Sequence, residues 1–246
     1  LFGEHGRPDY NSFVATFAHR VAAGLTPSVR DDRLMTLLHV QDAAAALLGA
    51  WHAGMSGVIE PGGDEVLISE VRDRLAGFHE CYRDGDIPPL VDAFDVLLFN
   101  TLRAAMFPGA YPFRPIPRSD ARGTLVESVR VHGGQGQTFV SSTNPGFTRG
   151  EHFHLHKIER FQVLSGRAVI RLRKLLTDQV VRFEVSGDDP AVVDMPTMWA
   201  HSIENIGDTE LVTLFWAHEL FDPEHPDTYP EPVLSPAGTV LSGLRS

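Results

Sequence analysis

Four prolines fall within the ten-residue stretch PGAYPFRPIP, and they separate two parts of the chain with different patterns. Proline lacks a backbone N–H and restricts the residue before it, so neither a long helix nor a central strand can cross this stretch. We therefore predict a proline-rich linker at residues 108–118. The domains on either side would span residues 1–107 and residues 119–246.

Residues 1–107 are predicted to be mostly helical. The apolar residues of FVATFAHRV recur every four positions after a cap at Asn11 or Ser12, as in an amphipathic helix. Further helices are expected over AAAALLGAW, after a cap at Ser69, and between residues 90 and 107. Short strands are expected at MTLLHV and near residues 65–68, and the strand-to-helix step at MTLLHV resembles one layer of an α/β domain.

The part after the prolines consists of short β-rich runs separated by glycine and proline. Such runs, with turn residues about every ten positions, are typical of an all-β sandwich or barrel. The chain is therefore predicted to be a multi-domain α+β protein with an all-β C-terminal domain. The predicted strands are TLVESVRV, QTFVSS, RFQVLSG, RAVIRLR, VVRFEVSG, AVVDMP and LVTLFWAH.

Histidines occupy alternate positions in the stretch GEHFHLHKIE, at His152, His154 and His156. Alternate residues of a strand face the same side, so two or three of these imidazoles would converge. Glu159 on the neighbouring strand and His201 further along the chain could complete a metal site. Zinc, manganese, iron and nickel all accept such ligands, and the spacing alone does not choose between them.

The composition restricts the partners. The net charge of −11 argues against nucleic acid and against an anionic membrane surface, and favours a small molecule or another protein. Cys81 is the single cysteine, so the fold does not depend on a disulfide within the chain, and a cytoplasmic setting is expected. No apolar run approaches the ~20 residues of a membrane span. Because the chain starts with Leu1, we expect a fragment or a processed protein.

The chain resembles the cupin superfamily, which has two conserved motifs. The histidine stretch matches the first motif, and a later stretch matches the second apart from Met198, which stands where that motif has glycine. The resemblance implies a double-sheet jelly roll that holds a metal through His152, His154, Glu159 and His201. His156 is left over, either as a proton carrier or supporting group at the cavity, or as a residue that points to solvent. The matching positions are Gly146, His152, His154, Glu159 and Gly166, then Pro196, His201 and Asn205.

Nearly the whole chain resembles the bifunctional capsular-polysaccharide enzymes that join a short-chain dehydrogenase/reductase domain to a zinc cupin. This family implies a nucleotide-sugar substrate, C3 epimerisation of a 4-keto UDP-6-deoxy-HexNAc, reduction at C4 with NAD(P)H, and a homodimer. The stretches that carry the resemblance include LFGEHGRPDYNSFVATF, LLHVQDAA, RSDARGTLVE, GFTRGEHFH, VSGDDPAVVDMP, SIENIGDTELVTLFW and FDPEHPDTY.

The reductase half looks incomplete in this chain. A dinucleotide fold needs glycines between its first strand and helix, but the cluster GGQG lies between β-like runs and is more typical of a hairpin. The reductases also use a Tyr with a Lys four residues later, and neither Lys157 nor Lys174 follows a tyrosine at that distance. We interpret residues 1–107 as the C-terminal, substrate-side portion of an extended short-chain reductase.

Lys157 and His156 are the candidates for proton transfer in such an epimerase. Arg171 and Arg173 are candidates for binding the diphosphate, although a solvated strand face explains them equally well. Two other readings stay open at this point. The cupin could be a non-catalytic module, stabilised by its metal and used for binding or dimerisation, or an iron cupin that activates oxygen.

Overall fold

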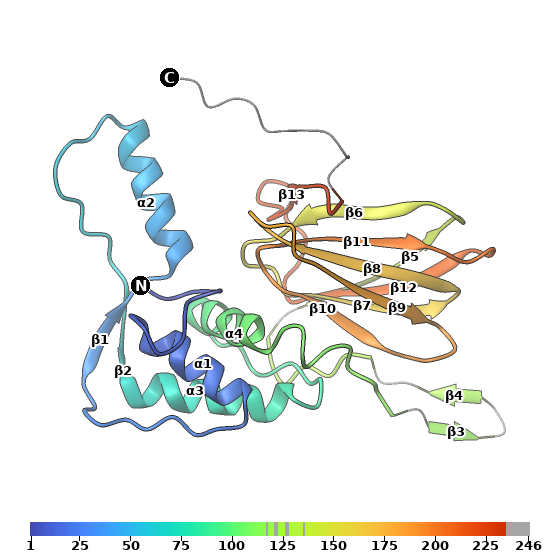
Figure 1. Cartoon of the computed structure of the whole chain (residues 1–246), viewed down its shortest axis with the longest axis horizontal. Coiled ribbons are helices and arrows are strands. Elements are labelled where there is room, and N and C mark those ends of the chain that lie inside the picture. Colours follow the sequence, from blue (N-terminus) through green and yellow to red (C-terminus); the bar gives the residue numbers. More distant parts are fainter. Residues whose placement is uncertain (117, 121–122, 126–127, 135, 235–246) are drawn as a thin grey trace.

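In the computed structural model the helices and the small β1–β2 sheet lie apart from the two large β-sheets (Figure 1). The structure describes residues 1–234 except 117, 121–122, 126–127 and 135. The end of the second predicted domain, residues 235–246, therefore lies outside the described residues, as do two positions of the predicted strand TLVESVRV. The helical part contains α1 (Phe13–Ala22), β1 (Leu34–Leu37), α2 (Val40–His52), β2 (Asp64–Leu67), α3 (Ile68–Tyr82) and α4 (Ala93–Met106).

The predicted first helix is confirmed as α1. The Ser12 side chain accepts a hydrogen bond from the backbone N–H of Ala15, which satisfies one of the unpaired donors at the helix start. Helices α1, α3 and α4 pack against one another around a common apolar core. Helix α2 contributes no buried residue and projects from this group at the edge of the molecule (Figure 1).

Two local predictions in this half are wrong. Ser69 does not cap α3, because the helix already begins at Ile68, and Ser69 instead bonds the carboxylate of Asp32 through its backbone N–H and its hydroxyl. The strand MTLLHV is also shorter than expected, since Val40 is the first residue of α2. β1 pairs with β2 in antiparallel register, so these two strands do not form the parallel layer that an α/β domain would require.

The C-terminal half is a β-sandwich. One sheet has the strand order β10-β7-β12-β5 and the other has β13-β6-β11-β8-β9. A separate two-stranded hairpin, β3 (Arg118–Asp120) with β4 (Gly123–Leu125), precedes them. The sandwich strands are β5 (Gln137–Thr143), β6 (Thr148–Phe153), β7 (Glu159–Ser165), β8 (Arg167–Lys174), β9 (Val180–Ser186), β10 (Val192–Met195), β11 (Trp199–Asn205), β12 (Leu211–Ala217) and β13 (Tyr229–Pro230).

Apolar side chains from both sheets fill the space between them. Phe161 and Phe215 come from the four-stranded sheet, and Ile170, Leu172 and Ile203 come from the five-stranded sheet, all in one buried cluster. Packing of this kind requires that alternate residues of each strand face inward. The predicted α+β class with a large β-sheet portion is therefore confirmed.

The proline-rich stretch packs against both halves. Tyr111 and Phe113 are buried, and the backbone N–H of Phe113 donates to the carbonyl of Val192 in β10. The hydroxyl of Tyr82 in α3 donates to the carboxylate of Asp194, also in β10. The helical part and the sandwich are thus joined by buried polar contacts. In the described part of the chain, no helix has the length and apolar character needed to span a membrane.

Candidate metal centre

Strands β6 and β11 bring two of the predicted ligands, His152 and His201, together. His152 lies directly opposite His201 in the antiparallel ladder, and the centroids of their rings are 4.6 Å apart. Gly150 makes this close approach possible, because a Cβ there would lie 2.7 Å from the carbonyl oxygen of His201. Gly150 also has a φ of 94°, which lies in a region that glycine adopts readily.

The other two predicted ligands arrive from the loop after β6 and from the opposite sheet. His154 follows the end of β6, and Glu159 is the first residue of β7. The Glu159 carboxylate lies 3.1 Å from Nε2 of His154 and 3.4 Å from Nε2 of His201. The carboxylate was predicted on the neighbouring strand, but it comes from the facing sheet of the sandwich. All four side chains offer ligand atoms within 4.8 Å of one another.

Backbone carbonyls orient two of these imidazoles. Nδ1 of His154 lies 2.5 Å from the carbonyl oxygen of Asp227, and Nδ1 of His201 lies 3.2 Å from that of Trp199. A ring that donates its Nδ1 proton to a carbonyl keeps Nε2 free as a metal ligand. Nε2 of His201 is buried and has no hydrogen-bond partner among the described residues. That unpaired atom, aimed at a carboxylate and two further imidazoles, is what a divalent metal would satisfy.

The pKa shifts of Glu159 and His152 also favour metal binding. Desolvation raises the pKa of Glu159, but the contact with His154 and the nearby His201 ring together outweigh this effect and the net pKa is lowered. Desolvation, followed by the neighbouring His201 and His154, lowers the pKa of His152 to about 4. Neutral imidazoles around an ionised carboxylate are the form in which these groups coordinate metal.

A cavity of about 310 Å³ opens over the cluster. Lys157 lines it, and its ammonium donates a 2.6 Å hydrogen bond to the carbonyl of Pro226. The loop that carries Lys157 is held by Asp227, whose carboxylate accepts the backbone N–H groups of residues 155, 156 and 157 at 3.0, 2.9 and 2.7 Å. The cavity is lined by Gln137, Phe139, His152, His154, Lys157, Glu159, Ala217, Glu219, Phe221 and Thr228.

His156 lies in the same loop but does not line this cavity. Its carbonyl accepts a 2.8 Å hydrogen bond from Asn100 of α4, and its ring centroid lies 6.3 Å from that of His39. The strand ends at Phe153, so the alternation that would have aligned His156 with His152 no longer applies. The ring therefore faces the helical part, in neither of the two positions expected from the sequence.

Arg171 and Arg173 also lie away from the cavity. Arg171 pairs with Glu204, and Arg173 pairs with Glu231 and bonds the carbonyls of Pro232 and Val233. Their neighbour Leu172 faces the core opposite His201, so the two arginines face outward by the alternation of the strand. Both arginines are thus already paired with carboxylates outside the cavity, and the arrangement gives no support to diphosphate binding there.

The sequence did not indicate three residues that surround the cavity and the Lys157 loop, namely Asp227, His218 and Glu219. They fall in HELFDPEHPDTY, where charged residues and prolines follow the last long strand without a periodic pattern. The only available signal was the similarity of FDPEHPDTY to the capsular-polysaccharide enzymes. That similarity named the stretch but assigned it no role.

His218 provides a pH-dependent test of the site's folding. Its pKa is lowered from 6.5 to about 4, first by desolvation and then by the cations of Arg103 and Lys157. Nδ1 of the neutral ring accepts the backbone N–H of Ile158 at 3.1 Å. As pH falls from 6.5 toward 4, the unfolded chain gains a proton at His218 that the folded chain excludes. We therefore expect the free energy of unfolding to fall in this window, by up to about 1.4 kcal/mol per pH unit from this group.

Urea unfolding of chelator-treated protein at several pH values would measure this. The His218→Gln variant should lose less stability than the parent through the same window, because glutamine does not titrate. Above pH 6.5 the two curves should run parallel. Equal losses in both proteins below that pH would contradict the prediction.

Comparisons with known proteins identify the family of the chain. The family described as the polysaccharide biosynthesis C-terminal domain matches residues 118–229. The UDP-2-acetamido-2,6-beta-L-arabino-hexul-4-ose reductase of Pseudomonas aeruginosa is 28% identical over 234 residues. That alignment covers 93% of this chain and 62% of the reductase, so the chain spans less than two thirds of this curated relative.

Two solved structures are also similar to the chain. Capsular polysaccharide assembling protein CapF from Staphylococcus aureus is 34% identical, with 95% of this chain and 69% of that chain covered and a TM-score of 0.49. The dTDP-6-deoxy-D-glucose-3,5-epimerase RmlC from Legionella pneumophila is 20% identical, with 45% and 67% covered and a TM-score of 0.40. The sequence identity to CapF extends over most of both chains, and the chain belongs to the CapF-like family of capsular-polysaccharide sugar-modifying proteins.

Proposed function

We propose that this chain carries the metal-dependent epimerase part of a nucleotide-sugar modifying enzyme. The substrate would be a 4-keto UDP-6-deoxy-HexNAc, epimerised at C3 to make a precursor of surface or capsular polysaccharide. The observation that carries the proposal is one cavity lined by Lys157 together with His152, His154 and Glu159, three of the four clustered candidate ligands. The name of the Pseudomonas aeruginosa relative, which is a reductase of a UDP-linked 4-ulose, supports the substrate class.

The proposal includes a domain arrangement. Residues 119–246 would be a cupin, residues 108–118 its linker, and residues 1–107 the substrate-side portion of a short-chain reductase. Reduction at C4 with NAD(P)H would belong to the longer proteins of the family, since this chain spans 62% of the Pseudomonas aeruginosa reductase. The cytoplasm, where nucleotide sugars are made, is the proposed compartment, and a homodimer the proposed assembly.

The chemistry requires a base and an acid on either side of C3. A proton on the carbon next to a ketone is acidified because its removal leaves an enolate, and epimerisation returns the proton to the opposite face. A divalent metal, zinc by the family resemblance, would supply positive charge for that enolate when bound to the cluster. Lys157 is the proposed proton-transfer residue, because it lines the cavity and is only 7% exposed. His156 ranks behind it, since its ring faces the helical part.

Incorporation of deuterium at C3 of a 4-keto UDP-sugar in D₂O tests the function. The metal-loaded parent should exchange this proton, and Lys157→Ala should slow the exchange by about 100-fold or more, the usual contribution of a positioned acid or base. His156→Ala is the matched control from the same loop and should exchange at nearly the parental rate. Both variants should keep their metal.

Each alternative outcome has a clear meaning. A metal-loaded parent that exchanges no proton of any nucleotide sugar would overturn the epimerase proposal and leave a metal-stabilised binding or dimerisation module. Loss of exchange in His156→Ala but not in Lys157→Ala would reverse the assignment of the proton-transfer residue.

A further inference from the structure

A second cavity, of about 270 Å³, lies where the helical part meets the sandwich. We call it the junction cavity. It lies apart from the metal centre, and none of the four candidate metal ligands lines it. Its walls come from the N-terminal loop, α1, the end of α4, the end of β8 and the start of β11, and include Gly3, Gly6, Ala15, Ala18, Ala104, Ala105, Phe107 and Pro108.

The polar lining of the junction cavity is basic. Arg7, His5, His19 and Lys174 all line it, and none of the described lining residues is acidic. This is unusual for a chain with a net charge of −11. Desolvation, followed by the charge of Lys174, lowers the pKa of His5 to about 4, so its ring adds no charge near neutral pH. Arg7 and Lys174, which share this concave site without a carboxylate among its described lining residues, create a positive potential that attracts anions.

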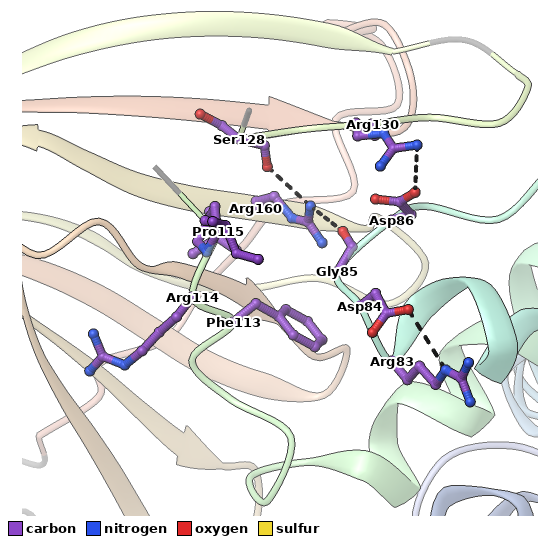
Figure 2. Close-up of a pocket in the computed structure, with 12 residues that line it drawn as sticks. Arg83, Asp84, Gly85, Asp86, Phe113, Arg114, Pro115, Ser128, Arg130 and Arg160 are labelled. Carbon is purple, nitrogen blue, oxygen red and sulfur yellow. Dashed lines mark hydrogen bonds and ion pairs between the residues drawn. The ribbon is translucent and has the colours of Figure 1, made fainter. Parts of the chain in front are cut away.

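A cavity of about 520 Å³ on another face provides a contrast (Figure 2). Its exposed arginines already have acidic partners, since Arg83 lies 3.7 Å from Asp84 and Arg130 lies 3.4 Å from Asp86. Arg160, in the same view, already donates hydrogen bonds to the carbonyls of Gly85 and Ser128. Its arginines are therefore less available to an anion than the basic groups of the junction cavity.

A buried donor adds a second, independent observation. The indole Nε1 of Trp199 has no hydrogen-bond partner among the described residues, although Trp199 is 4% exposed and lines the junction cavity. This atom is enclosed by protein, so an acceptor reaches it only when neighbouring side chains shift. An unpaired buried N–H costs about 1–3 kcal/mol, and such an acceptor would recover this energy. Trp199 is also the direct cross-strand partner of Lys174, so the two side chains leave the sheet on the same face.

The cavity's size limits the ligand. At about 270 Å³ it is smaller than the ~300–1,000 Å³ of pockets that enclose drug-sized molecules. It can hold a compact anion but not a whole nucleotide sugar. Arg and Lys with an added N–H donor are the groups that bind phosphate oxygens.

We propose that the junction cavity binds a phosphate or diphosphate group. Lys174 and Arg7 provide the charge, and the Trp199 indole provides a directional donor. One residue links the two otherwise separate sites, because the side chain of Trp199 lines the junction cavity and its carbonyl contacts Nδ1 of His201. This proposal does not depend on the epimerase activity, since it concerns binding at a separate cavity.

Calorimetric titration of the full chain with inorganic phosphate at low ionic strength tests the site. The parent should bind phosphate, and Lys174→Gln and Arg7→Gln should each weaken binding by about tenfold, as expected for the loss of one charge-assisted hydrogen bond. Arg20→Gln is the matched control, because Arg20 lies on α1 outside the cavity and pairs with Asp9. Tryptophan fluorescence should change on binding in the parent but not in Trp199→Phe.

Binding at the metal must be separated from binding at the junction cavity. His152→Ala, which damages the metal centre, should retain phosphate binding. Binding that is lost in His152→Ala but unchanged in Lys174→Gln and Arg7→Gln would overturn the proposal, as would a parent that binds no phosphate at concentrations on the order of 10 mM.

Titration with UDP in the His152→Ala background distinguishes the source of the phosphate. Tighter binding of UDP than of phosphate, lost in the double variant with Lys174→Gln, would identify a nucleotide diphosphate as the ligand. Equal binding of the two would identify free phosphate.

Discussion

Replacing Asp194 by asparagine is expected to lower the free energy of unfolding by about 3–5 kcal/mol, the range for removing one partner of a buried ion pair. Asp194 is completely buried and accepts two hydrogen bonds from Arg160, at 2.6 Å and 2.9 Å. Asparagine keeps the size of the side chain but removes the charge. The variant would therefore leave the Arg160 guanidinium buried without its counter-ion.

A second buried cation places the expected loss at the upper end of this range. Arg103 is also fully buried and donates to the hydroxyl of Tyr82, which in turn donates to Asp194. Two guanidiniums thus depend on one carboxylate. These positive charges and the Tyr82 hydroxyl hold the pKa of Asp194 below its ordinary value, although desolvation raises it.

Urea unfolding measures this effect, with Asp189→Asn as the control. Asp189 pairs with Arg114 on the surface, where the two side chains are 71% and 57% exposed, so its loss should cost no more than about 1 kcal/mol. Because Asp194 joins β10 to α3, the variant should also weaken the attachment of the helical part to the sandwich. A loss below about 1 kcal/mol in Asp194→Asn would show that the buried network has little net value.

Replacing His201 by alanine is expected to weaken metal binding by more than about 100-fold, since even the outer partners of metal ligands contribute about 10–100-fold. His201 is fully buried, and its Nε2 faces the Glu159 carboxylate at 3.4 Å. The substitution removes a ligand and leaves a cavity beside Phe161, whose ring centroid lies 5.7 Å from that of His201. We therefore expect a lower melting temperature as well as a loss of metal.

Metal content after dialysis, measured by mass spectrometry, checks this prediction. His156→Ala is the control, because it removes an imidazole of the same histidine run that lies outside the cluster. It should keep one equivalent of metal. If His201→Ala holds as much metal as the parent, the ligand set is wrong, and equal losses in both variants would place His156 among the ligands.

Several features could be predicted from the sequence because they depend on local spacing. The Ser12 cap and the helix that follows it need only neighbouring residues, and the short strands after the prolines follow from alternation and turn residues. The cluster of His152, His154, Glu159 and His201 could also be predicted, since the two cupin-like motifs specify it by their spacing.

Other features depend on contacts between residues far apart in the chain, which periodicity does not describe. The turn after Phe153 directed His156 toward His39, and the alternation of β8 directed Arg171 and Arg173 outward. The Asp227 carboxylate that holds the Lys157 loop comes from a segment 70 residues later in the chain.

The sequence by itself thus determined the α+β class and the identity of the candidate ligands. Only the tertiary structure decided which side chains share a cavity, because that depends on how the two sheets and the helical part pack. It also revealed the junction cavity, whose basic groups lie as far apart in the chain as Arg7 and Lys174. The pKa shifts of the buried groups also depend on the tertiary structure, because desolvation and contacts with new partners arise only when distant segments pack together.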